Sequence, residues 1–144
     1  MVQGKWYPMG ADLSVPMQIR QAVFGRGRDS LDDMAQQVVV FRGEEPAGTA
    51  RLWWQEGAFV LGDVCVLPPL RHQGFGDLLV RLLLFKALTH SATEIRLTAP
   101  ADVAGFFAAY GFHAQEEQNG VVPMFIRADE IHLSHCGGHC DGCQ

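Results

Sequence analysis

The sequence predicts a mixed α/β fold in which helices cover a central sheet. Three observations support this: a series of short apolar strands in the first half, a long apolar helix in the middle, and a strand, helix, strand order at the end. Successive elements of a small protein are usually neighbours in space and are joined by short connections. We therefore expect a layered mixed sheet with a helical crossover in its middle.

Length and composition limit the chain to one compact unit. It has 144 residues, 48% of them hydrophobic and 19% charged, which suits one core but not two ordinary domains. A formal net charge of -5 argues against nucleic acid as a general partner. The start, residues 1–8, lacks the features of a signal peptide, and no apolar run reaches membrane-spanning length. We expect a cytoplasmic protein with no membrane partner.

The first half of the chain predicts one helix and then three strands. Ser14–Phe24 carries apolar residues at a loose helical period. A short polar helical turn over Leu31–Gln37 precedes a β-branched strand, Val38–Phe41. Two further strands, Ala47–Trp54 and Ala58–Leu67, are joined by a turn short enough to make them antiparallel neighbours. The three strands should form a meander.

The second half predicts two helices that alternate with two strands. Phe75–His90 is apolar almost all round, which is typical of a helix buried on most of its faces. Glu94–Thr98 alternates as a strand does, and Val103–Tyr110 then carries apolar residues at helical spacing before Gly111 ends it. Val121–Ile126 is the last expected strand.

The passage from the third strand of the meander into the long helix is typical of a phosphate-binding loop. The segment from Arg71 to Gly76 contains two glycines and opens a helix, whose first N–H groups are unpaired and lie at the positive end of the helix dipole. A dinucleotide fingerprint would need glycine at Leu79, and a P-loop would need Gly-Lys-Ser/Thr. A bare Gly-x-Gly is most often a tight structural turn, but the flanking strand, arginine and helix favour an anion site.

This segment resembles the central signature of the GNAT superfamily of acyl-CoA-dependent N-acyltransferases. That signature is arginine or glutamine, two residues, glycine, one residue, then glycine or alanine, and Arg71, Gly74 and Gly76 match it. The similarity extends to segments that resemble the family's third strand, fourth strand and later helix with its turn: Glu45–Leu52, Leu61–Pro68 and Phe106–Phe112. It covers residues 19–126.

The resemblance implies a GNAT-like fold and an acetyl-CoA site. The sheet would be mostly antiparallel, with flanking helices and one splayed parallel pair that leaves a slot for the cofactor. Strand backbone would pair with the pantetheine arm, and loop N–H groups would hold the pyrophosphate. The cofactor-binding residues implied are Val64, Cys65, Val66, Arg71, His72, Gln73, Gly74, Phe75, Gly76 and Asp77.

The implied activity is transfer of an acetyl group from acetyl-CoA to an amine of a small molecule or peptide, by direct attack in a ternary complex. This chemistry needs an uncharged amine, a stabilised oxyanion and a proton for the leaving thiolate. Family members often supply that proton from a tyrosine four residues before the glycine of the Gly-Phe turn. Phe107 occupies this position here.

Two other side chains are candidates for proton transfer. Tyr110 lies three residues after Phe107 and is the candidate acid, with a core-filling ring as the alternative. Asp63 is the candidate base, directly or through water, with a salt bridge or a solvated strand position as the alternative. Strand alternation would place Asp63 on the same face as Leu61 and Cys65.

Two other residue types near this site have simpler interpretations. Cys65 lies between two valines, so a small apolar filler is a better interpretation than an acyl-carrying nucleophile. Trp53 and Trp54 present one indole to each face of a strand, so we expect one to pack in the core and the other to be available to an acceptor pocket.

The end of the chain carries a second, independent pattern. Residues 132–143 contain six His and Cys side chains, and thiolate with imidazole favours zinc or another soft transition metal. The candidate ligands are Cys136, His139, Cys140 and Cys143, with His135 as an alternative to His139. A glycine-rich tail with reactive thiols fits equally well. We divide the chain into an acyltransferase domain, residues 1–130, and a Cys/His-rich tail, residues 131–144.

Two functions from other classes remain open on the sequence alone. Phe107 at the usual acid position suits a non-catalytic acyl-CoA-binding sensor, and the tail suits a metal-responsive protein. Exposed sheet edges permit a homodimer but do not require one.

Overall fold

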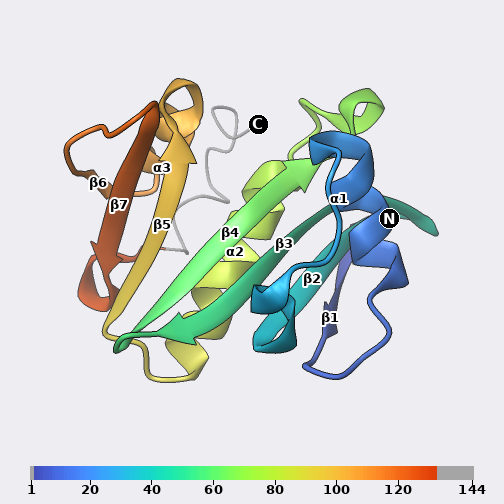
Figure 1. Ribbon diagram of the computed structural model, residues 1–144, viewed down its shortest axis with the longest axis horizontal. Coiled ribbons are helices and arrows are strands. Elements are labelled where there is room, and N and C mark those ends of the chain that lie inside the picture. Colours follow the sequence, from blue (N-terminus) through green and yellow to red (C-terminus); the bar gives the residue numbers. More distant parts are fainter. Residues whose placement is uncertain (1, 133–144) are drawn as a thin grey trace.

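The fold is a seven-stranded mixed sheet with helices on both faces (Figure 1). The computed structural model describes residues 2–132. The strand order is β1-β2-β3-β4-β5-β7-β6, and every neighbouring pair is antiparallel except β4 with β5. The strands are β1 (Val2–Tyr7), β2 (Ala35–Arg42), β3 (Glu45–Gln55), β4 (Ala58–Val66), β5 (Glu94–Pro100), β6 (His113–Ala114) and β7 (Val121–Arg127). The helices are α1 (Ser14–Phe24), α2 (Phe75–Thr89) and α3 (Ala104–Ala108). The mixed α/β fold expected from the sequence is confirmed.

Three features differ from the sequence expectation. The helical turn expected over Leu31–Gln37 is instead a 3₁₀ turn, Ser30–Asp33. A capping box from Asp29 and Asp32 stabilises its start, and it ends after one turn because β2 begins at Ala35. The two edge strands, β1 and β6, were not expected. Most of β1 is exposed, so its sequence has no alternation of apolar and polar residues. With only two residues, β6 is too short to show a pattern.

Each face of the sheet has its own apolar core. Helix α2 packs on one face and contributes Leu79, Val80 and Leu83, which are fully buried. Helix α1 packs on the other face, where Ile19 contacts a smaller cluster that includes Val39. Within residues 2–132, no helix is long and apolar enough to cross a membrane.

Strand β4 contains a bulge that reverses its side-chain alternation. Arg51 of β3 is opposite Gly62, whereas Thr49 is opposite Cys65, so β4 has one extra residue in this interval. As a result, Leu61 packs in the core beneath α2 and Cys65 in the core beneath α1. The expectation that these two residues share a face was wrong, because the bulge breaks the two-residue period.

The parallel strands β4 and β5 are paired only near their beginnings. Their register is Phe59 with Ile95 and Val60 with Arg96. Beyond this point the two strands diverge towards their carboxyl ends, as Figure 1 shows. The facing edges of β4 and β5 are therefore not paired with each other where the strands separate, while β4 stays paired with β3 and β5 with β7.

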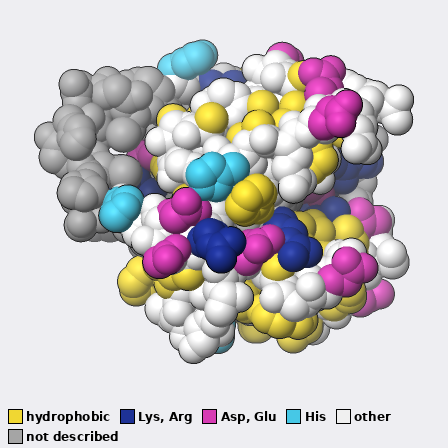
Figure 2. Space-filling model, turned by 90° about the vertical axis from the view of Figure 1, so that its left-hand side faces the viewer, with side chains coloured by type: hydrophobic (Ala, Val, Ile, Leu, Met, Phe, Trp, Pro, Cys, Tyr) yellow, Lys and Arg dark blue, Asp and Glu magenta, His cyan; other side chains and the backbone are white. Residues whose placement is uncertain are grey.

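The side of the sheet formed by β5, β7 and β6 ends in a short edge strand, β6, and carries charged side chains. Figure 2 views this side of the molecule and shows acidic and basic side chains side by side across its middle. His113 of β6 contacts Glu130 at 2.8 Å, and Glu94 pairs with Arg96 on β5 at 2.6 Å. Charges and a short strand both disfavour pairing with the edge of another sheet.

Candidate functional site

A large cleft lies where β4 and β5 diverge. Its volume is about 1280 Å³. Residues 61–66 of β4 line one wall and residues 97–100 of β5 line another. The start of α2, the residues around α3, the end of α1 and residues 130–132 also line it. The cleft therefore contacts the loop that the sequence indicated as an anion site.

The loop before α2 has the backbone conformation that an anion site requires. Gly74 is the N-cap of α2 with φ +87°, and His72 is also left-handed, with φ +65°. No side chain caps α2, so its first N–H groups remain available. Nε of Arg71 donates to the carbonyl oxygen of Val66 at 2.9 Å, which ties the loop to the end of β4.

Most of the expected cofactor-binding residues line this cleft. Those that do are Val64, Cys65, Val66, Arg71, His72, Phe75, Gly76 and Asp77. Gln73 and Gly74 are not among the lining residues, and the Gln73 side chain instead accepts a hydrogen bond from Arg42 at 3.3 Å. The structure thus brings the end of β4 and the loop to one cavity, and cofactor binding by these residues stays a prediction.

Phe107, at the position of the family's usual acid, packs in the core. Its ring is 7% exposed and lies 6.1 Å from that of Phe112 and 5.1 Å from that of Phe106, between centroids. Gly76 faces Phe106, and a Cβ at Gly76 would lie 3.6 Å from that ring. The rings of Phe106 and Phe107 form an apolar wall of the cleft.

Tyr110 bridges two elements of the cleft. It lies just after α3, which ends at Ala108 and not at Tyr110 as expected. Its hydroxyl donates to the carboxylate of Asp77, in the first turn of α2. Nε of Arg81 donates to the same carboxylate at 2.7 Å. Tyr110 and Asp77 both line the cleft, so this hydrogen bond connects α2 to the segment after α3 across the cavity.

The chemistry of Cys65 fits an apolar filler. The side chain is 6% exposed, and burial, with a smaller contribution from Asp63, raises the pKa of its thiol to about 12. A thiol is a weak nucleophile at neutral pH when its pKa is this high. Trp53 is buried and Trp54 is 53% exposed, and neither of them lines the cleft.

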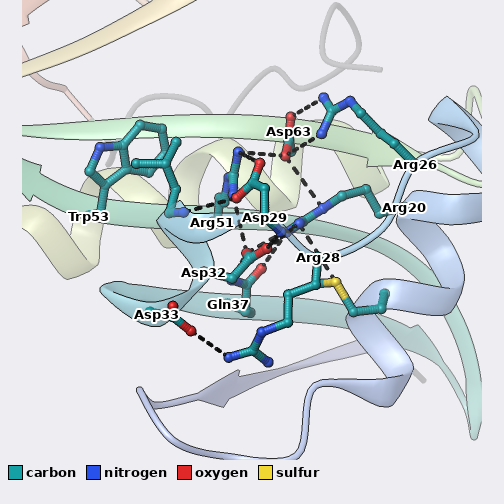
Figure 3. Close-up of polar contacts among 12 residues, drawn as sticks. Arg20, Arg26, Arg28, Asp29, Asp32, Asp33, Gln37, Arg51, Trp53 and Asp63 are labelled. Carbon is teal, nitrogen blue, oxygen red and sulfur yellow. Dashed lines mark hydrogen bonds and ion pairs between the residues drawn. The ribbon is translucent and has the colours of Figure 1, made fainter.

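A cluster of charged side chains lies beneath α1 and reaches the cleft (Figure 3). We call it the charge cluster; its members are Arg20, Arg26, Arg51, Asp29, Asp32 and Asp63. Arg20 and Asp32 have fully buried side chains, 2.9 Å apart. Gln37 accepts a hydrogen bond from Arg20 at 2.8 Å. The three positive charges face three negative charges, so each buried ion has a partner.

The pKa values of the cluster favour its charged state. Burial alone would raise the pKa of Asp32, but the hydrogen bond and charge of Arg20 outweigh it and lower that pKa to about 2. The hydrogen bond from Arg51 lowers the pKa of Asp29. Sequence reasoning missed this cluster, although the spacing of Asp29 and Asp32 is that of the capping box that positions them.

Asp63 joins the charge cluster to the cleft. Its carboxylate accepts hydrogen bonds from Arg26 at 2.6 and 3.2 Å and lies 3.1 Å from a terminal nitrogen of Arg51. Asp63 and Arg26 both line the cleft. The salt bridge that the sequence left open as an alternative for Asp63 is therefore present.

The expected metal ligands lie outside the described residues. They are Cys136, His139, Cys140 and Cys143, with His135 as the alternative. Among residues 2–132, no three His, Cys, Asp or Glu side chains are grouped so that they could hold a metal ion.

Comparisons with known proteins agree with this fold. The family model of the acetyltransferase (GNAT) domain matches residues 34–114. The Bacillus subtilis (strain 168) protein named uncharacterized N-acetyltransferase YjcF is 28% identical over 105 residues, covering 73% of this chain and 71% of its own. An acyl-CoA N-acyltransferase from Pseudomonas aeruginosa has a TM-score of 0.79 at 22% identity, over 87% of this chain and 99% of its own. A GNAT family acetyltransferase from Elizabethkingia anophelis, solved with acetyl-CoA bound, has a TM-score of 0.70 at 13% identity, over 88% of this chain and 97% of its own. The chain belongs to the GNAT acetyltransferase family.

Proposed function

We propose that the chain transfers an acetyl group from acetyl-CoA to an amine of a small molecule or peptide. The observation that supports this most is the cleft between the diverging strands β4 and β5, which ends at the uncapped start of α2. Backbone groups of Val64 and Val66 suit the pantetheine arm, and the N–H groups from His72 to Asp77 suit the pyrophosphate. We assign this activity to a single domain, residues 1–130.

The acceptor amine would enter from the end of α1. Val23, Phe24 and Arg26 line the cleft on this side. In acetyl transfer, the amine nitrogen bonds to the carbonyl carbon of the thioester, the carbon–sulfur bond breaks, the nitrogen loses a proton and the thiolate gains one. Direct attack requires both substrates in the cleft at once, and a volume of about 1280 Å³ allows this.

Tyr110 is our proposed proton donor to the thiolate. It is the one tyrosine among the described residues that line the cleft, and its hydroxyl already takes part in a hydrogen bond across it. Tyr110→Phe should lower kcat about 100-fold, as is typical when a general acid is removed. Tyr7→Phe is the matched control, because Tyr7 is buried beneath α1, away from the cleft.

Thiol release from acetyl-CoA tests the activity. The purified chain is incubated with acetyl-CoA and a panel of primary amines, amino acids and peptides, and free CoA is measured against a sample without acceptor. We expect release that depends on at least one amine and an acetylated product of matching mass. Binding of acetyl-CoA without turnover on any amine would contradict the transfer.

A non-catalytic acyl-CoA sensor is the second candidate. It is favoured by Phe107, which is packed in the core where the family's acid usually lies, and by the engagement of Tyr110 with Asp77. The two functions differ in one measurement: a sensor binds CoA tightly but releases no thiol from acetyl-CoA with any amine, in the wild type or in Tyr110→Phe.

A further inference from the structure

The backbone of Asp63 is left-handed in the middle of a strand. Its φ is +52°, and it lies within the bulge of β4. This conformation is unfavourable for residues other than glycine, and aspartate and asparagine tolerate it best. A non-glycine residue stays in such a conformation only where its surroundings hold it there.

The surroundings of Asp63 are three arginines from separate parts of the chain (Figure 3). Arg20 comes from α1, Arg26 follows α1, and Arg51 comes from β3. Arg26 binds both carboxylate oxygens, while the other two contact Oδ2, with Nε of Arg20 at 3.4 Å and a terminal nitrogen of Arg51 at 3.1 Å. The side chains of Arg20 and Arg51 are 0% and 6% exposed, so both are themselves fixed by packing.

We propose that Asp63 is a positioning residue that holds the bulge of β4, and not the base that accepts the amine proton. Both carboxylate oxygens are already engaged by guanidinium groups, and removing one partner from a buried cluster of paired charges is unfavourable. The bulge comprises Asp63 and Val64, between Gly62 and Cys65, so it sets the direction of the backbone that lines the donor side of the cleft. This inference rests on the proposed function of that cleft.

Arg26 links the bulge at Asp63 to the end of α1, on the side of the cleft where the amine would enter. Its guanidinium lies 4.9 Å from the ring centroid of Phe24, and both residues line the cleft. The ion pair with Asp63 therefore joins the end of α1 to the bulge. Through this pair, the wall facing the amine and the strand facing acetyl-CoA are held in one arrangement.

Two substitutions at position 63 separate positioning from base catalysis. Asp63→Asn keeps the side-chain shape, one acceptor oxygen for the arginines and the tolerance for a left-handed backbone, but it loses the negative charge and cannot take up a proton. Asp63→Ala removes the contacts with all three arginines. For each variant we would measure the Kd of CoA by calorimetry, kcat and the pH dependence of kcat/KM for the amine.

The positioning role predicts that Asp63→Asn keeps kcat within about fivefold and leaves the pH profile unchanged. Asp63→Ala should weaken CoA binding by about five- to thirtyfold. Without the contacts to the arginines, nothing offsets the one to two kcal/mol of strain in the left-handed backbone, and the bulge relaxes. A base would behave differently: Asp63→Asn would lower kcat at least about 100-fold and remove the acidic limb of the profile, with the Kd of CoA unchanged.

Arg26→Gln provides a second test that does not alter the bulge residue itself. Arg26 is half-exposed, so this variant should fold even if Asp63→Ala does not, and it should weaken CoA binding in the same direction. Arg28→Gln is the matched control, since Arg28 is similarly exposed and pairs only with the exposed Asp33 among the contacts found for its side chain. If Asp63→Ala or Arg26→Gln binds CoA as tightly as the wild type does, the positioning role is wrong but the proposed function still stands. A wild-type chain that does not bind CoA overturns this role and the proposed function together.

Discussion

Gly74, in the loop before α2, has a backbone conformation that makes it sensitive to substitution. Its φ of +87° is in the region that favours glycine, and a Cβ added there would meet no atom within 4 Å. Gly74→Ala therefore tests conformation alone, without a steric clash. The left-handed backbone costs an L-residue about 1–2 kcal/mol. For a chain of this size that corresponds to a fall in Tm of roughly 2–8 °C.

The same substitution should weaken CoA binding if the loop relaxes to relieve the strain. The N–H groups that follow Gly74 would then turn away from the cleft, and the full strain corresponds to a loss of affinity of about five- to thirtyfold. Calorimetric titration with CoA measures this loss, and thermal unfolding followed by circular dichroism measures the change in Tm.

Two other glycines provide matched controls. Gly43 lies in the turn between β2 and β3 with φ +63° and equally open surroundings, so Gly43→Ala should lower Tm similarly and leave CoA binding unchanged. Gly76 has no positive φ, and its Cβ would make ordinary contact with Phe106, so Gly76→Ala should bind CoA within about twofold of the wild type. Unchanged Tm and affinity in Gly74→Ala, or an equal loss of affinity in Gly43→Ala, would refute this reasoning.

Two further predictions concern buried groups. The pKa of Asp32 is lowered from 3.8 to about 2, so the stability that its carboxylate contributes is present above pH 4 and is lost as the pH falls towards 2. The free energy of unfolding, measured by urea titration, should therefore drop by about 2 kcal/mol over this range. Asp32→Asn should remove this acid dependence and destabilise the fold by about 3–5 kcal/mol, because Arg20 and Arg51 lose a buried partner. Cys65→Ala should keep kcat within about threefold, since a buried thiol with a pKa of about 12 does not carry the acyl group. A fall in kcat of more than about 100-fold would instead indicate that Cys65 is a nucleophile.

The parts of the site that could be predicted from the sequence are those with local signals. The loop from Arg71 to Gly76 combines glycine spacing, a preceding strand and a following helix, and all of these lie within a short stretch of chain. The structure places that loop and the end of β4 against the same cleft. Helix α1 was likewise predicted with its observed bounds, because its apolar period and the glycine after it are both local.

The bulge and the charge cluster depend on contacts between distant residues. Nothing adjacent to Asp63 indicates that Arg20, Arg26 and Arg51 surround it, because these residues meet only when α1 and β3 pack beside β4. The bulge could not be predicted from the sequence for a similar reason, since an extra residue in β4 is defined only by its register with β3. Strand β1 depends on its pairing with β2 and not on a pattern of its own.

A crystal structure of the chain grown with CoA tests the central claim most directly. We predict CoA in the cleft, with its pantetheine arm along Val64–Val66 and its pyrophosphate at the N–H groups of residues 72–77. Density for CoA elsewhere on the molecule, or a cleft that stays without it at concentrations well above a measured Kd, would contradict the assignment of this cleft as the acetyl-CoA site.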